Sequence, residues 1–168
     1  MTDSTRASDS ERARSPERPE GRRPGTPAGE ARATVEEESA IRRLLAEYCH
    51  AYDDKRADDF AALFTEDAEF QVFGQTRRGR QEIRDHIGVQ QPGMPPGQHV
   101  TYNSVIEIDP SGDTARAWTD FMYLRRDGDG HTISNAGRYH DRLVRDADRW
   151  RFGSRTIVFL GDDVPPDA

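Results

Sequence analysis

Four polar side chains that are distant in the sequence fall on or beside apolar faces of the predicted elements. Tyr48 lies within a helical apolar stripe, and Asp53 follows it five residues later at the end of the same helix. His99 begins a predicted strand, and Asp120 stands between two large apolar residues of the next strand. Such groups are common general acids and bases, and burying them is costly unless they bond to one another or to a ligand. Together they indicate acid–base chemistry in an apolar pocket.

Each of these residues, taken alone, also has an ordinary structural explanation. A tyrosine in a helix stripe commonly packs in the core with its hydroxyl at the edge. A carboxylate at a helix end is commonly solvated, and a histidine that opens a strand after a loop is commonly exposed. The functional interpretation therefore depends on whether the four side chains meet around one cavity.

The elements that must position these groups begin at residue 35. One helical stripe is formed by Ile41, Leu44, Leu45, Tyr48 and Tyr52. Thr34 is the candidate N-cap of this helix, and the acidic residues after it suit the helix dipole. His50 falls opposite the stripe and is expected to face solvent, whereas Asp53 lies on its flank.

Two shorter helices and a series of strands follow. Segments 57–64 and 79–89 have helical apolar spacing, 68–74 alternates as a short strand, and 90–98 is a loop rich in Pro and Gly. The apolar period then changes to two and predicts strands at 99–109, 114–126, 131–145 and 149–160. Because short turns link these strands, we expect an α+β domain with helices on one face of a curved antiparallel sheet.

Alternation along the strands groups further candidate substrate contacts. Asn103 falls on the face of His99, and Trp118 and Met122 flank Asp120 on one face of the next strand. The predicted substrate-binding set is Asn103, Trp118, Met122, Tyr139 and Arg155. Alternation alone does not fix which faces of neighbouring strands meet.

Composition separates a tail from the folded part. Residues 1–34 contain no Val, Ile, Leu, Phe, Trp or Tyr, so we expect a disordered tail there, with a docking arm as the alternative. The tail lacks the apolar region of a secretory signal, and its six acidic residues argue against a transit peptide. We expect the folded domain at 35–161 and a C-terminal tail at 162–168.

Charge and cysteine content argue against several classes of function. The chain carries −7, and the first 34 residues carry +1 from seven Arg and six acids, which leaves −8 on the remainder. Such an acidic domain is poorly suited to nucleic acid, and no stretch approaches the roughly 20 apolar residues of a membrane span. Cys49 is the only cysteine, which excludes an internal disulfide and is compatible with a reducing cytoplasm. The residues near His50 and His140 show no metal-ligand spacing, so we expect neither metal nor cofactor.

Six blocks of the chain, in order, resemble the SnoaL-like branch of the NTF2-like superfamily. They include IRRLLAEYCHAYDDKRADDFAALFTEDAEF, GQHVTYNSVIEID and GRYHDRLVRDADRWRF, and together they span about residues 36–161. The resemblance implies a cone in which three helices and a curved sheet enclose one hydrophobic pocket, often in a homodimer or homotrimer. The superfamily includes dehydratases, isomerases, cyclases and non-catalytic proteins, so a shared fold does not decide function.

The pocket residues resemble those of scytalone dehydratase and the bile-acid dehydratases. The pattern of that branch is matched by Tyr48, Asp53, His99 and Asp120, and its basic residue on the last strand by Arg155. The sets of residues that steroid isomerases and epoxide hydrolases require are not evident.

The resemblance implies proton abstraction next to a carbonyl, followed by loss of water or ring closure. His99 is the expected general base, Asp53 its hydrogen-bonded partner, and Tyr48 the donor to the developing enolate oxygen. Asp120 is a second acid–base group whose pKa would be raised on a dry face. Arg155, with Asn103, is expected to orient the substrate.

The expected ligand is a small hydrophobic carbonyl compound of polyketide, steroid or terpenoid size. The alternative is a non-catalytic subunit that uses the same cone to hold an apolar ligand or a protein partner. A dioxygenase small subunit is an example, and it would predict a filled cone with the polar groups scattered or paired off.

Overall fold

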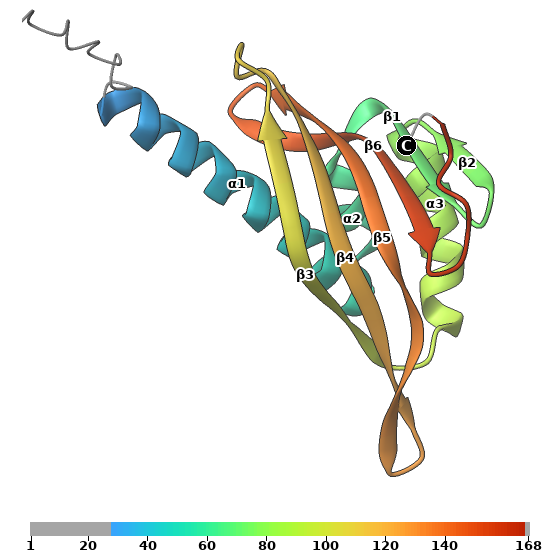
Figure 1. The fold of residues 1–168 in the computed structure, drawn as a ribbon. Helices are drawn as coiled ribbons and strands as arrows, with labels where there is room; N and C mark the ends of the chain where they lie inside the picture. Colours follow the sequence, from blue (N-terminus) through green and yellow to red (C-terminus); the bar gives the residue numbers. More distant parts are fainter. Residues whose placement is uncertain (1–27, 167–168) are drawn as a thin grey trace, which may run out of the picture.

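The computed structural model describes residues 28–166, which fold into three α-helices, a short 3-10 helix and one six-stranded sheet (Figure 1). The helices are α1 (Ala28–Asp53), α2 (Ala57–Ala62), α3 (Arg80–Gln90) and the 3-10 helix η1 (Gln91–Gly93). The strands are β1 (Phe64–Val72), β2 (Gln75–Arg78), β3 (Gly97–Ile108), β4 (Thr114–Asp127), β5 (Gly130–Asp146) and β6 (Arg149–Phe159). The predicted α+β class is confirmed, and the four long strands lie within two residues of their predicted ends.

The strand order is β2-β1-β6-β5-β4-β3, and every pair is antiparallel except β1 with β6, which run parallel. The sheet is therefore mixed rather than wholly antiparallel, because β1, which precedes the four-stranded meander, runs beside β6 in the same direction. Strand β2 was not expected, since four residues are too few to show alternation. A two-residue turn, Phe73–Gly74, joins it to β1 with φ angles of 51° and 69°, the left-handed pair that suits tight hairpins.

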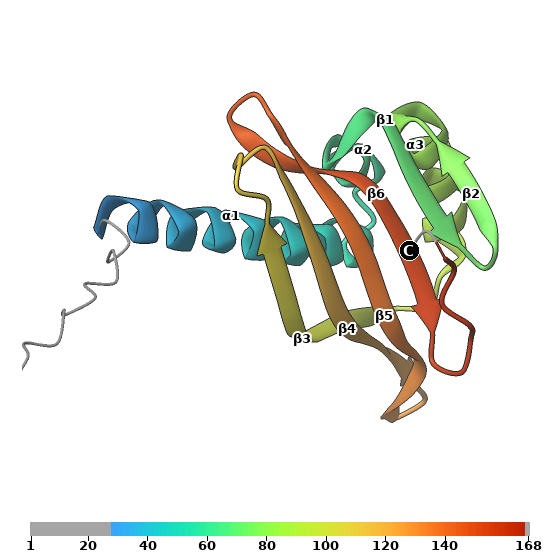
Figure 2. The ribbon, with the colours of Figure 1, turned by 45° about the horizontal axis from the view of Figure 1, so that its top comes forward.

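The helices cover one face of the curved sheet, and the first part of α1 projects beyond its edge (Figures 1 and 2). Between helices and sheet lies a core rich in aromatic rings. The ring of Tyr48 lies 4.7 Å from that of Phe60 and 5.7 Å from that of Phe152. These contacts join helices α1 and α2 to strand β6, so the apolar stripe predicted on α1 faces the sheet.

Helix α1 begins at Ala28, earlier than the sequence indicates. Thr34 is therefore an interior helical residue and not the N-cap, because the Ala, Glu and Arg residues before it favour helix. The first turn predicted for this helix meets the sheet, where the Trp150 indole N–H donates to Glu37 at 2.7 Å and Arg145 pairs with the same carboxylate. Residues 1–27 of the predicted tail, and 167–168 at the other end, lie outside the described residues. No helix in residues 28–166 is long and apolar enough to cross a membrane.

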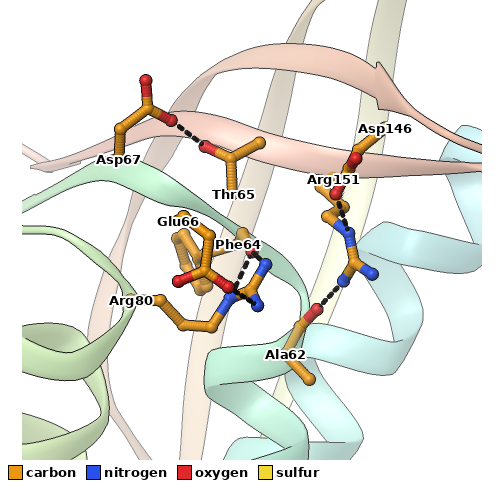
Figure 3. Close-up of polar contacts among 8 residues, drawn as sticks. All are labelled: Ala62, Phe64, Thr65, Glu66, Asp67, Arg80, Asp146 and Arg151. Atoms are coloured by element: carbon orange, nitrogen blue, oxygen red, sulfur yellow. Dashed lines mark hydrogen bonds and ion pairs between the residues drawn. The ribbon is translucent and has the colours of Figure 1, made fainter.

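Two arginines hold the junction between α2 and β1 (Figure 3). The Arg80 guanidinium donates to the Phe64 carbonyl at 2.9 and 2.6 Å and also pairs with Glu66. Arg151 donates to the Ala62 carbonyl. These carbonyls lie where a helix ends and a strand begins, where the regular ladder of helical hydrogen bonds stops. The two arginines thus fix how the helical layer joins the sheet.

Cys49 provides a chemical test of this packing. It is buried on α1, and burial raises the pKa of its thiol to about 11. We expect labelling by Ellman's reagent at pH 7 to 9 to be at least ~100-fold slower in the folded protein than in urea, because the buried thiol stays protonated there. Similar rates in both conditions would show that this face of α1 is open to solvent.

Candidate functional site: an apolar pocket with a His–Asp pair

A cavity of about 440 Å³ lies between the helical layer and the sheet. Its wall is mainly aromatic and aliphatic, with few polar atoms. The lining residues are Tyr48, Tyr52, Phe70, Val72, Phe73, Ile87, Gln90, Gly93, Met94, His99, Phe121, Tyr123, Asn135, Tyr139, Ile157 and Phe159. A chamber of this size and composition is typical of small-molecule sites and differs from a filled cone.

His99 is held against this wall by both oxygens of one carboxylate. Asp53 Oδ1 lies 2.6 Å from His99 Nδ1, and Oδ2 accepts the His99 backbone N–H at 2.8 Å. A carboxylate oxygen can only accept from Nδ1, so this contact favours the tautomer with the proton on Nδ1 and leaves Nε2 as the ring nitrogen that can bond a ligand. Both side chains are nearly enclosed, at 12% and 11% exposed, so bulk water competes weakly for this pair.

Aromatic neighbours fix the plane of the imidazole. The ring of Tyr52 meets it edge-on at 5.0 Å, and the ring of Tyr123 lies 4.7 Å away. Tyr123 is itself anchored, because its hydroxyl donates to the Pro95 carbonyl at 3.1 Å. The buried Gln91 amide donates to the Tyr52 carbonyl at 3.2 Å and so ties the loop before β3 to the end of α1.

Under the pocket lies a fully buried ion pair between Arg155 and Asp141. Arg155 Nε and Nη2 each donate to one carboxylate oxygen at 2.7 Å, and both side chains are 0% exposed. The guanidinium carbon also lies 3.9 Å from the ring centroid of Tyr48 and 4.1 Å from that of Tyr139. The charge of Arg155 is thus engaged by Asp141 and by two aromatic faces that line the cavity.

Burial controls the protonation of both cavity phenols. It raises the pKa of Tyr48 and of Tyr139 well above the usual tyrosine value, and it outweighs the opposing effect of Arg155. Burial likewise raises the pKa of Asp141, against the attraction of the guanidinium. The two phenols therefore remain neutral hydrogen-bond donors throughout the physiological range.

The structure brings together Tyr48, His99 and Tyr139 on the cavity wall, with Asp53 directly behind the imidazole. It does not bring Asp120 there, and the prediction that this carboxylate shares the pocket is wrong. In β4 the inward residues are the alternate set that includes Thr119 and Phe121, so Asp120 points to the outer face of the sheet. Alternation grouped the residues of β4 correctly but did not show which group faced inward.

Trp118 and Met122 share the outer face with Asp120 and do not line the cavity. The Asp120 carboxylate accepts from Arg138 at 2.6 Å, and this bond lowers its pKa. The pKa was expected to be raised on a dry face, and the expectation is wrong because an arginine and solvent surround the carboxylate. Asp120 is therefore an ordinary ion-pair partner.

Asn103 also departs from its predicted face. The β3–β4 register shifts between Tyr102 and Val105, and Asn103 has a left-handed φ of 50°. This bulge turns Asn103 outward, where its amide donates to Asp120 at 3.3 Å. Arg155, predicted to orient substrate, is instead sealed beneath the cavity wall by Asp141.

Sequence reasoning missed Asp141 and the aromatic clamp of Tyr52 and Tyr123. Asp141 alternates with Tyr139 and Leu143 along β5, which is the one sequence signal that it points inward. A larger hollow of about 1050 Å³ lies against the outer face of the sheet, lined mainly by polar and charged residues that include Arg116 and Arg142. We place the site at the smaller cavity, because His99 and both buried phenols line it. In residues 28–166, no three His, Cys, Asp or Glu side chains are grouped to hold a metal ion.

Comparison with protein-family models matches residues 33–156 to the SnoaL-like domain. The chain belongs to the SnoaL-like family. The match includes the whole His–Asp pair, both cavity phenols and the buried ion pair beneath them. The fold also resembles that of a solved NTF2-like protein from Novosphingobium aromaticivorans, with a TM-score of 0.74 at 23% identity.

Several relatives of this SnoaL-like domain are themselves without an assigned function. An uncharacterized protein of Mycobacterium tuberculosis is 28% identical over 71% of this chain and 82% of its own length. The structure of another protein of unknown function from that species matches with a TM-score of 0.70 at 27% identity, covering 80% of this chain and 76% of the other. A putative scytalone dehydratase from Novosphingobium aromaticivorans matches with a TM-score of 0.68 at 22% identity, covering 77% and 88%. The last likeness supports the fold.

The buried ion pair gives a stability test. Arg155→Met or Asp141→Leu alone should lower the free energy of unfolding by about 3–5 kcal/mol, because each strands a buried charge. The double variant should recover most of the loss, as measured by urea denaturation. Asp120→Asn, at the exposed pair, should cost no more than about 1 kcal/mol. Strictly additive losses in the double variant would contradict coupling between Arg155 and Asp141.

Proposed function

We propose that this SnoaL-like protein is a cofactor-independent lyase, isomerase or cyclase that acts on a small apolar carbonyl compound. The observation that carries the proposal is the His99–Asp53 pair on the wall of an apolar cavity. A histidine whose Nδ1 is held by a carboxylate presents Nε2 as a base, and the carboxylate stabilises the imidazolium that forms.

In the proposed step, His99 Nε2 removes a proton from the carbon next to the substrate carbonyl. The electrons of the broken C–H bond form the C=C bond of an enolate, and the carbonyl π electrons move to oxygen. In a dehydration, the enolate then expels a hydroxyl group from the neighbouring carbon, and the imidazolium returns its proton to release water. In an isomerisation, the imidazolium instead returns the proton to another carbon of the conjugated enolate. In a cyclisation, the enolate carbon attacks a second carbonyl carbon of the same substrate, the π electrons of that carbonyl move to its oxygen, and the imidazolium protonates that oxygen.

Tyr48 is the proposed donor to the enolate oxygen. Its phenol lines the cavity and is neutral because burial raises its pKa, while Arg155 over its ring favours the build-up of negative charge nearby. One such donor in a dry site is worth about 3 kcal/mol of transition-state stabilisation.

A non-catalytic ligand-binding subunit is the second candidate. A likeness to the beta subunit of a putative aromatic-ring-hydroxylating dioxygenase from Novosphingobium aromaticivorans favours it, with a TM-score of 0.66 at 25% identity. The open cavity and the orientation of His99 support catalysis over a purely structural role. Exchange of substrate protons separates the two candidates.

Removal of the base gives the main test. The full chain should catalyse exchange of the protons next to the carbonyl of 2-tetralone, or of related bicyclic ketones, for deuterium in D2O, followed by proton NMR. His99→Ala should lower this rate by about 100-fold or more without unfolding the domain. His50→Ala, an exposed histidine on α1, should stay within about twofold of the parent. An unchanged rate in His99→Ala would remove His99 from the mechanism, and no exchange by the parent would favour the binding subunit.

The role of Asp53 is tested separately. Asp53→Asn keeps an oxygen for the His99 backbone N–H but loses the charge that stabilises an imidazolium, so exchange should fall about 100-fold. Asp54→Asn changes the neighbouring exposed carboxylate, which pairs with Arg56, and should leave the rate unchanged. Equal effects of the two substitutions would show that Asp53 acts only through helix stability.

A further inference from the structure

The Tyr139 hydroxyl is a buried polar group that lacks a hydrogen-bond partner among the described residues. Tyr139 is 1% exposed, lines the cavity, and its oxygen bonds no protein atom of residues 28–166. The ring is tightly held, with Phe121 stacked on it at 4.2 Å and 1° and the Arg155 guanidinium 4.1 Å from its centroid. A fixed, dry hydroxyl without a partner forfeits a hydrogen bond unless a ligand supplies one.

Within residues 28–166, the wall around this hydroxyl offers no counter-ion in direct contact. The residues of this range that line the cavity include no Lys, Arg, Asp or Glu, and His99 among them is already paired with Asp53. Arg155 lies behind the rings of Tyr48 and Tyr139, with two nitrogens bonded to Asp141 and Nη1 without a partner in residues 28–166. A carboxylate or phosphate that entered would leave water without a direct ion pair, and the guanidinium behind the rings would offset only part of that desolvation cost.

We infer that the Tyr139 hydroxyl donates a hydrogen bond to an oxygen of the bound molecule, and that the cavity selects uncharged, oxygen-bearing apolar compounds over carboxylates and phosphates. Tyr139 is then the residue that recognises the oxygen, whereas Tyr48 beside Arg155 is the donor proposed for the reaction. The inference rests on the proposed function only in taking this molecule to be the substrate.

Binding of three matched bicyclic probes tests this selection. They are 2-tetralone, which carries a ketone, tetralin, which has no oxygen, and tetralin-2-carboxylate. Dissociation constants are measured by NMR titration of the full chain, of Tyr139→Phe and of Tyr102→Phe. Tyr102 is a matched control, because this tyrosine lies at an exposed outer-face position opposite Asp120.

The parent should bind the ketone, and the carboxylate at least about 100-fold more weakly. Tyr139→Phe should weaken the ketone about 10-fold and leave tetralin unchanged, and Tyr102→Phe should change neither. Equal loss for ketone and hydrocarbon, a carboxylate that binds as well as the ketone, or no ketone binding would overturn the inference. Because only binding is measured, the result is independent of His99: a ketone can bind through Tyr139 without proton exchange, and exchange can occur without Tyr139.

Discussion

A single carboxylate, that of Asp53, joins the two halves of this domain at its candidate site. One oxygen accepts the backbone N–H of His99 and the other its imidazole, so the end of α1 and the start of β3 share one anchor. The bond to the backbone places the strand, and the bond to the ring orients the side chain. Positioning and chemistry thus depend on the same group, and a shift of the helix end would disturb both.

The surrounding layers explain why this anchor can work in a dry environment. Tyr52 and Tyr123 flank the imidazole, and the buried Arg155–Asp141 pair supports the aromatic floor through Tyr48 and Tyr139. The free-energy cost of burying an unpaired guanidinium in that position would be too high for a stable fold. The ion pair with Asp141 therefore allows a cation to lie beneath an apolar cavity. The chamber receives the influence of the charge without exposing it to a ligand.

The sequence predicted the elements well, because helical and alternating apolar patterns are local properties. Family resemblance also predicted that Tyr48, Asp53 and His99 lie around one pocket. The predicted positions of Asp120 and Asn103 were wrong for two physical reasons. For Asp120, alternation does not tell which face of a strand is inward, and for Asn103, a bulge in β3 changes the face on which the side chain lies. The Arg155–Asp141 pair depends on register between β5 and β6, which no single-strand pattern contains.

The chemistry proposed for this pocket requires that His99 keeps its proton on Nδ1, toward Asp53, and offers Nε2 to the cavity. Long-range nitrogen–proton NMR of histidine-labelled protein reads this tautomer directly. We predict a protonated Nδ1 and an unprotonated Nε2 whose resonance moves when 2-tetralone is added. A proton on Nε2 with a bare Nδ1, or a ring that does not respond to any ketone that binds, would contradict it.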